Sequence, residues 1–229
     1  MEYPHNRPYT ADDLVRIITL LRDPVNGCPW DKVQTHTSIR MNFLEEAYEA
    51  VDALDLDDPV LMCEELGDVL MQVAFHTCME QETGRFTWEQ VCDGVCQKLI
   101  ERHPNIFGTQ PGYEGITDWD ALKNKEKGRR TLADELESVP RAMPALMRAA
   151  KMQKRAARHG AALQGADAAA LADAAENLQT AQPASAQAEQ AVGELLFAAA
   201  NLARQAGVDP EQALQKANEA FCTAAGPVA

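Results

Sequence analysis

The residues with the clearest chemical potential are acidic side chains between positions 41 and 70. These 30 residues hold ten acids and no lysine or arginine, in a chain with 35 acids in all. Two pairs are spaced three apart, Glu46 with Glu49 and Glu65 with Asp68. Side chains three apart on a helix lie on one face, one turn from each other. Each pair is therefore predicted to present two carboxylates on the same side of a helix.

Both pairs lie among apolar residues such as Leu44 and Val69, so the carboxylates belong on or beside the apolar stripes of their helices. The short linker at 55–59 makes the two helices antiparallel neighbours, and the pairs then face each other across a seam. Crowded carboxylates must take up protons, spread apart or bind a cation. A solvated helix face explains any single pair. Two pairs on adjacent helices without basic partners favour a cation.

The chemistry of the donors narrows the choice of ion. Oxygen ligands select Mg²⁺, Mn²⁺ or Ca²⁺ over zinc or copper. Di-iron bundles use Glu-x-x-His pairs, and Glu2 with His5 in an unpatterned tail is the only such pair, so iron is rejected. The sequence has no EF-hand loop, which disfavours a Ca²⁺-binding structural protein. A magnesium site suits phosphoanhydride hydrolysis, because the ion binds substrate phosphates and can activate water.

A phosphate-hydrolysing site also needs cationic groups for the remaining phosphate charge. Lys98 and Arg102 are four residues apart near the end of a later helix and could supply them. The alternative is a solvated helix end, where positive charge is favoured by the helix dipole.

The elements that must position these residues are helical. The chain has no alternating Val/Ile/Thr-rich run bounded by hairpin turns, whereas helical periodicity is widespread, so an all-α fold is predicted. The Pro- and Gly-rich segment 103–117 is predicted to be an ordered loop, and a second break is expected around 128–145. The expected helices cover residues 10–22, 38–55, 60–82, 87–102, 118–128, 141–158, 166–180, 186–206 and 210–222.

Composition limits the possible partners. The chain has 229 residues and a formal net charge of −14, which argues against nucleic acid or an anionic membrane as the main partner. A small anionic substrate stays possible, because a bound divalent cation reverses the local field. No signal-peptide core or membrane-spanning run is found, and the six cysteines form no CxxC pair. A cytoplasmic protein with reduced thiols is expected.

The second half of the chain differs from the first but contains a faint repeat of it. Nine of the fifteen residues from 161 to 175 are alanine, which predicts a helical region with a thinner core. The segment 65–72 resembles 191–198 at an offset of 126 residues, which aligns Gly67 with Gly193. Two copies of one helical unit are therefore expected.

Several motifs together resemble a known family. They are GCPWDK at 27–32, LEEAYE at 44–49, EELGD at 64–68 and KLIERHPNIFG at 98–108. In this order, over roughly residues 10–130, they are similar to MazG-type nucleoside triphosphate pyrophosphohydrolases. The resemblance implies an all-α fold and Mg²⁺ dependence, with Mn²⁺ as a possible substitute. It also implies that metal-activated water hydrolyses a nucleoside triphosphate to the monophosphate and pyrophosphate, in a homodimer or larger homo-oligomer.

The resemblance also implies roles for individual residues. The metal ligands would be Glu46, Glu49, Glu65 and Asp68, and Glu45 would support them or position the attacking water. The proposed substrate-binding residues are Lys98 and Arg102 for the phosphates, Trp30, Asp31 and Lys32 for the nucleotide pocket, and Trp119 or Lys123 for its closure.

The second half departs from the family pattern. Two-domain relatives carry a second acidic set, but here its first motif aligns with Ala175, Glu176 and Gln179, and its second with Ala191 and Glu194. Loss of carboxylates removes both the charge and the geometry that hold a metal. Residues 1–130 are therefore expected to form a MazG-like catalytic domain, and 131–229 a degenerate, Ala-rich MazG-like domain. The alternative is a catalytically weak or inactive helical module that binds nucleotide or protein and has a regulatory role.

Overall fold

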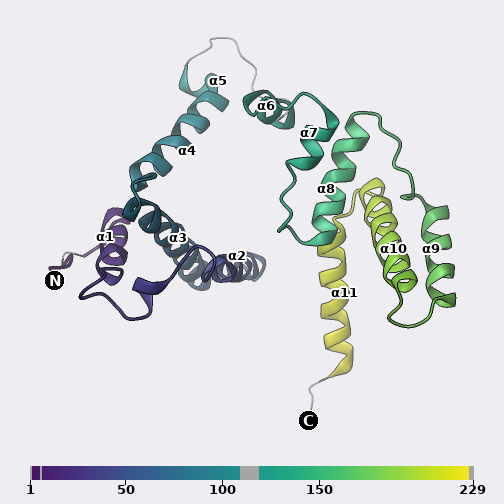
Figure 1. Ribbon diagram of the computed structural model, residues 1–229, viewed down its shortest axis with the longest axis horizontal. Helices are drawn as coiled ribbons and strands as arrows, with labels where there is room; N and C mark the ends of the chain where they lie inside the picture. Colours follow the sequence, from purple (N-terminus) through teal and green to yellow (C-terminus); the bar gives the residue numbers. More distant parts are fainter. Residues whose placement is uncertain (1, 6, 109–118, 227–229) are drawn as a thin grey trace. The chain divides into compact units, whose positions relative to one another are not determined.

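The structure is a computed structural model that describes residues 2–5, 7–108 and 119–226. Every regular element in these ranges is helical and none is a strand (Figure 1), which confirms the predicted all-α class. None of the helices described is long and apolar enough to cross a bilayer. The chain divides into two compact units, Met1–Ile116 and Thr117–Ala229.

The first helix of the first unit starts at a side-chain cap. The Thr10 hydroxyl accepts from the Asp13 N–H, and the Asp13 carboxylate accepts from the Thr10 N–H. This capping box satisfies backbone donors that the first turn of a helix leaves free. The elements are α1 (Ala11–Leu21), the 3₁₀ turn η1 (Asp31–Val33), α2 (Arg40–Asp55), α3 (Pro59–Glu82), α4 (Trp88–Arg102) and α5 (Pro104–Phe107).

Helices α2 and α3 form an antiparallel hairpin, as the short linker predicts. Asp57 in this linker has a φ of 53°, in the left-handed region that reverses the chain tightly. Asp58 then caps α3 by accepting from the N–H groups of Val60 and Leu61, and Pro59 occupies the first helical position. The two helices pack along each other, which brings the acidic residues of both onto one seam.

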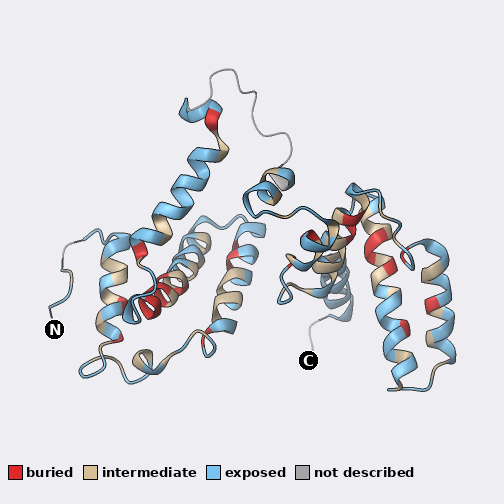
Figure 2. Ribbon diagram, turned by 45° about the horizontal axis from the view of Figure 1, so that its top comes forward, coloured by how far each residue is buried: buried red, intermediate tan, exposed pale blue. Residues whose placement is uncertain are grey.

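The core of the first unit lies at one end of α3. Its members are Ile18, Ile39, Ala74, Phe75, Cys78, Met79 and Trp88. Every buried residue of α3 falls between Gln72 and Glu80 (Figure 2). By contrast, Leu66 and Leu70 expose 51% and 40% of their surface. The second half of α3 therefore anchors the helix in the core, while the first half packs mainly on α2 and carries Glu65 and Asp68.

The second unit has a core of small side chains. Ala156, Ala174, Ala191 and Ala198 are buried, and the buried Gln153 amide donates to the Phe197 carbonyl at 2.7 Å. Its helices are α6 (Trp119–Glu126), α7 (Leu132–Glu137), α8 (Ala145–Arg158), α9 (Ala168–Thr180), α10 (Ala186–Gln205) and α11 (Pro210–Ala225). Because alanine buries little apolar area, hydrogen bonds from buried amide side chains contribute a larger share of the stability of this unit than of the first.

Two short helices occupy segments that were expected to lack regular structure. The predicted loop 103–117 contains α5, and its remainder from 109 onward lies outside the described residues. The break expected at 128–145 contains α7, which starts with a capping box between Thr131 and Asp134. These helices are too short to show periodicity, so only their caps could have revealed them.

The first compact unit ends at Ile116, earlier than the domain boundary at 130 expected from the sequence. Helix α6 belongs to the second unit, and its Asn124 side chain hydrogen-bonds Glu135 of α7. That the second unit is itself MazG-like stays a prediction.

Candidate functional site

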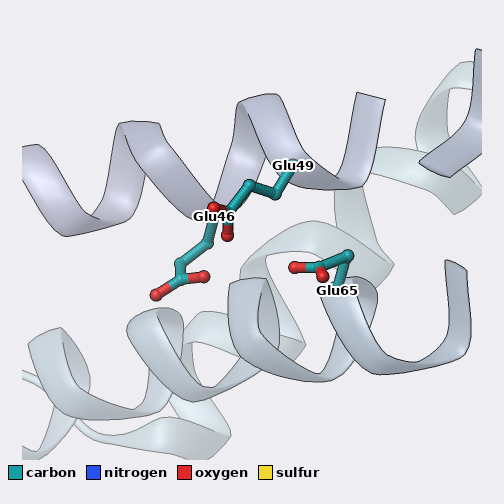
Figure 3. A group of neighbouring side chains, drawn as sticks. All are labelled: Glu46, Glu49 and Glu65. Atoms are coloured by element: carbon teal, nitrogen blue, oxygen red, sulfur yellow. The ribbon is translucent and has the colours of Figure 1, made fainter. Parts of the chain in front are cut away.

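Three carboxylates from two helices meet on the α2–α3 seam. Glu46 and Glu49 are one turn apart on α2, and Glu65 reaches toward them from α3 (Figure 3). Each offers an oxygen, and the three oxygens lie within 4.8 Å of one another. The spacing of three residues on α2 and the antiparallel hairpin thus bring together three of the four carboxylates that the sequence analysis grouped. We refer to Glu46, Glu49 and Glu65 as the acidic cluster.

Burial and neighbouring carboxylates both disfavour the ionised forms of Glu46 and Glu65 in the acidic cluster. Partial burial, followed by the charges of Asp68 and Glu49, raises the pKa of Glu46 despite a hydrogen bond from Gln72. Partial burial, then Glu49 and Asp68, raises the pKa of Glu65. Within the described ranges, no Lys, Arg or His forms an ion pair with these three residues. The acidic cluster therefore holds negative charge that the described protein groups do not compensate.

The other two acids predicted for the site lie at its edge. Asp68 is half-buried on α3 and contributes to the raised pKa of both Glu46 and Glu65, but it is not among the three clustered groups. Glu45 is exposed on α2, directly before Glu46. Asp68 is thus an electrostatic neighbour of the cluster, and Glu45 is available to solvent beside it.

Gln72 is a member of the site that sequence reasoning missed. Its Nε2 lies 3.4 Å from Glu46 Oε1 and donates a long hydrogen bond, whereas its buried Oε1 has no partner among the described residues. Gln72 is four residues after Asp68 and seven after Glu65, so helical spacing placed it on the same stripe. An uncharged side chain at this spacing gives no separate signal of function.

The predicted phosphate-binding residues are not brought to the acidic cluster. Lys98 is exposed and Arg102 half-buried, both in the C-terminal half of α4. Helix α4 joins the core through Trp88 at its start and leads away from the α2–α3 pair (Figure 1). Their role in phosphate binding stays a prediction from the resemblance.

The GCPWDK segment is anchored to the first unit by backbone hydrogen bonds, such as that from the Cys28 N–H to the Leu21 carbonyl, and by the Arg22 guanidinium. Arg22 is buried and binds the Glu82 carboxylate through two hydrogen bonds of 2.6 and 2.8 Å. It also donates to the backbone carbonyls of Asp31 and Gln34. Trp30 exposes 56% of its surface, so it is not a core residue, and Lys32 is half-buried. The segment is thus held firmly while the indole of Trp30 stays free to contact a ligand.

The last two predicted substrate residues belong to the other unit. Trp119 and Lys123 are both in α6, within Thr117–Ala229. Lys123 is exposed, and the Trp119 side chain lies outside the described part of the chain. Their role in closing the pocket stays a prediction.

A histidine pair at the core end of the hairpin was also missed. The Nδ1 atoms of His36 and His76 are 2.7 Å apart, and His36 Nε2 donates to Glu80 Oε1 at 2.5 Å. The buried Glu80 carboxylate also pairs with Arg85 at 2.6 Å. Burial, followed by the charge of His36, lowers the pKa of His76. This network ties the segment before α2 to the buried half of α3.

The donors of the acidic cluster fit a hard divalent cation. They are carboxylate oxygens only, from three side chains close enough to share one ion, and burial together with neighbouring carboxylates raises the pKa of Glu46 and of Glu65. Magnesium and calcium prefer such oxygen ligands. A cation bound here would remove the repulsion that burial and proximity create.

Comparison with known proteins identifies the class to which this fold and site belong. Residues 34–107 match the MazG nucleotide pyrophosphohydrolase domain, a range that contains both acidic helices. Over 219 residues the chain is 41% identical to a nucleoside triphosphate pyrophosphohydrolase of Escherichia coli, covering 92% of this chain and 83% of that protein. Over 212 residues it is 38% identical to the nucleoside triphosphate pyrophosphohydrolase/pyrophosphatase MazG of Thermotoga maritima, covering 92% and 82%. A nucleoside triphosphate pyrophosphohydrolase of Mycobacterium tuberculosis is 34% identical over 154 residues, covering 66% and 46%.

The chain therefore belongs to the MazG nucleotide pyrophosphohydrolase family, a family of hydrolases. This confirms the family predicted from the GCPWDK, LEEAYE and EELGD motifs.

Proposed function

We propose that the chain hydrolyses nucleoside triphosphates to the nucleoside monophosphate and pyrophosphate at the acidic cluster of the first unit. The observation that carries this proposal is the meeting of three uncompensated carboxylates, from two helices, in the part of the chain that matches the family domain. The names of the relatives from Escherichia coli and Thermotoga maritima support the same reaction.

In this proposal Glu46, Glu49 and Glu65 hold a divalent ion, Mg²⁺ or Mn²⁺, and Asp68 adds negative charge beside them. When bound, the ion supplies positive charge for the phosphate oxygens and makes water a stronger acid. Gln72 holds the Glu46 carboxylate in place through its hydrogen bond. Glu45 faces solvent next to the site and is proposed to orient the attacking water.

The substrate contacts are proposed on different grounds. Trp30 is the best supported, because its ring is exposed on a segment that Arg22 holds rigidly, and an aromatic face can stack on a nucleobase. Asp31 and Lys32 belong to the same segment. Lys98 and Arg102 are proposed as phosphate contacts, and Trp119 or Lys123 as closing residues, on the family resemblance.

Self-association is proposed as well. Helix α2 exposes large apolar side chains, among them Tyr48, Val51 and Leu54, each at 50–53% of its surface. An exposed apolar face on a two-helix layer favours a second copy of the chain as its cover, in a homodimer or larger homo-oligomer. Light scattering on the purified chain tests this, and a monomer at all concentrations would contradict it.

The reaction is tested by measuring pyrophosphate released from each nucleoside triphosphate with Mg²⁺ or Mn²⁺. Glu49→Gln removes one charge of the acidic cluster while keeping side-chain size, and should lower the rate by at least about 100-fold. The matched control is Glu64→Gln, an exposed acid on α3 directly beside Glu65, which should keep most of the activity. Absence of pyrophosphate release with any nucleotide and either ion would overturn the proposal.

A further inference from the structure

Charge is divided very unevenly between the two units. By sequence, the first unit has 21 acids against 8 Lys and Arg, whereas the second has 14 acids against 13. Within the second unit, α8 carries five basic residues and no acid. The second unit therefore carries 13 of the chain's 21 Lys and Arg residues, and α8 is one of its basic segments, in a different unit from the acidic cluster.

The basic face of α8 lines a cavity of about 700 Å³. The other walls come from the end of α10 and the linker to α11, so three segments of the second unit build it. The cavity receives four cationic side chains, Lys151, Lys154, Arg155 and Arg204. A volume of this size is in the range of pockets that bind small molecules.

Two of these cations are positioned by neutral groups. The Arg155 guanidinium donates to Ser138 Oγ at 2.8 Å and to the Glu135 carbonyl. Arg204 Nε donates to Asn201 Oδ1 at 2.9 Å, and Asn201 is buried. Neither bond neutralises the positive charge. These side chains are therefore oriented while their charge stays available.

The other two cations have no acidic partner in the described parts of the chain. Lys151 and Lys154 are exposed, and neither forms an ion pair with a described carboxylate. The cavity has one acid on its wall, Asp209, whose Oδ1 accepts the N–H groups of Glu211 and Gln212 as the cap of α11. The four cationic side chains of the cavity are thus accompanied by a single carboxylate, that of Asp209, which already accepts hydrogen bonds from backbone N–H groups.

We propose that this cavity binds the oligophosphate group of a small anionic ligand. Two or more linked phosphates supply the charge that four cations require, and Arg groups bind phosphate oxygens through paired hydrogen bonds. Met147 and Val208 add apolar surface to the cavity, which can accept the non-phosphate part of a nucleotide. The site is separate from the acidic cluster, so the second unit has a binding function of its own.

Calorimetric titration of the full-length chain tests the proposal. Inorganic pyrophosphate and ATP are the probes, and a chelator removes divalent ions so that binding is measured without hydrolysis. Saturable binding of at least one probe is expected, and it should weaken as salt is raised. Equal affinities would identify the phosphates alone as the recognised group, whereas tighter binding of ATP would show that the apolar wall contributes.

A double variant that combines Lys151→Gln with Lys154→Gln tests whether the probes bind in this cavity. Both side chains are exposed, so the fold should be kept, which circular dichroism checks. At least a tenfold loss of affinity is expected for the double variant. Lys127→Gln, an exposed lysine of the same unit outside the cavity, should bind like the wild type. Absence of saturable binding of both probes, or unchanged affinity in the double variant, would overturn the proposal.

Discussion

The α2–α3 and α9–α10 hairpins differ in the side chains that lie on the seam between their two helices. In α2–α3 the seam carries three clustered carboxylates, whereas in α9–α10 it buries alanines such as Ala174 and Ala191. The repeat offset of 126 places Ala191 at the position of Glu65. A seam of carboxylates needs a cation to relieve repulsion, while a seam of alanines packs closely without one.

The second hairpin keeps part of the acidic pattern. Glu176 and Glu194 stand at the places of Glu46 and Asp68, but Gln179 replaces Glu49. Two of the three clustered groups are therefore missing, and within the described ranges the only acidic cluster close enough to hold an ion is that of the first unit. We propose that the second hairpin has no catalytic role.

The largest expected effect is a difference in pyrophosphate release between variants of the two hairpins. Glu65→Ala reproduces in the first unit the residue found at 191, and it should lower pyrophosphate release about 1,000-fold, equivalent to about 4 kcal/mol. Glu194→Gln in the second unit should change the rate by no more than about twofold. Similar losses in both variants would show that the hairpins share the reaction.

The next largest expected effect is a difference in the stability lost when a core residue of each unit is made smaller. Phe75→Ala empties a large buried site beside α1 and should cost about 3 kcal/mol. In the second unit, Ala198→Gly removes one methyl group and adds backbone freedom, at a cost of about 1 kcal/mol. Denaturant unfolding followed by circular dichroism measures both, and equal costs would contradict the thinner alanine core.

A smaller effect concerns the buried acid of the second unit. Glu135 is bound by Arg158 at 2.5 Å and His159 at 2.7 Å, much as Glu80 is bound by Arg85 and His36 in the first. Burial opposes ionisation of Glu135, but hydrogen bonds from His159 and Asn124 and the charge of Arg158 outweigh it, so its pKa is lowered.

A lowered carboxyl pKa stabilises the folded state above the ordinary carboxyl range and loses that contribution as pH falls through the folded value. Glu135→Gln should therefore cost about 2 kcal/mol at pH 7 and much less at strongly acidic pH. Thermal unfolding across pH 3–7 measures this difference. A cost that does not change with pH would mean that packing, rather than charge, explains the loss.

The smallest effect is a gain in stability at the acidic cluster. The raised pKa of Glu46 means that ionisation costs the folded state free energy as pH rises above the ordinary carboxyl range. Without divalent ions at pH 7, Glu46→Gln should raise the melting temperature by about 2 °C. Added Mg²⁺ should stabilise the wild type more than the variant. A lower melting temperature for the variant in chelator would contradict the repulsion.

The longer helices were predictable from the sequence because apolar periodicity and the positions of proline residues indicate the same helix boundaries. The predicted helix 38–55 contains α2 at Arg40–Asp55, and the predicted helix that starts at 210 matches the start of α11 at Pro210. Helix α7 was missed because six residues cannot show a period, although its Thr131–Asp134 capping box was visible in the sequence.

The candidate site was predictable where it depends on local spacing. Glu46 and Glu49 follow from their position on one helix, and Glu65 follows from the antiparallel linker. The bond between His36 and His76 joins residues 40 positions apart, and no local pattern reveals such a contact. The path of α4 was equally hidden, because the loop that follows α3 sets its direction, so the distance of Lys98 from the cluster could not be foreseen.

The confinement of buried residues to the second half of α3 has a consequence for hydrogen exchange. Amides near Leu66 and Leu70 are held by the partner helix alone, so they should exchange through local opening of the hairpin. Amides between Gln72 and Glu80 are protected by the core and should exchange only through unfolding of the whole unit. One continuous helix is thus expected to span two levels of protection, with Glu65 and Asp68 in the less protected part.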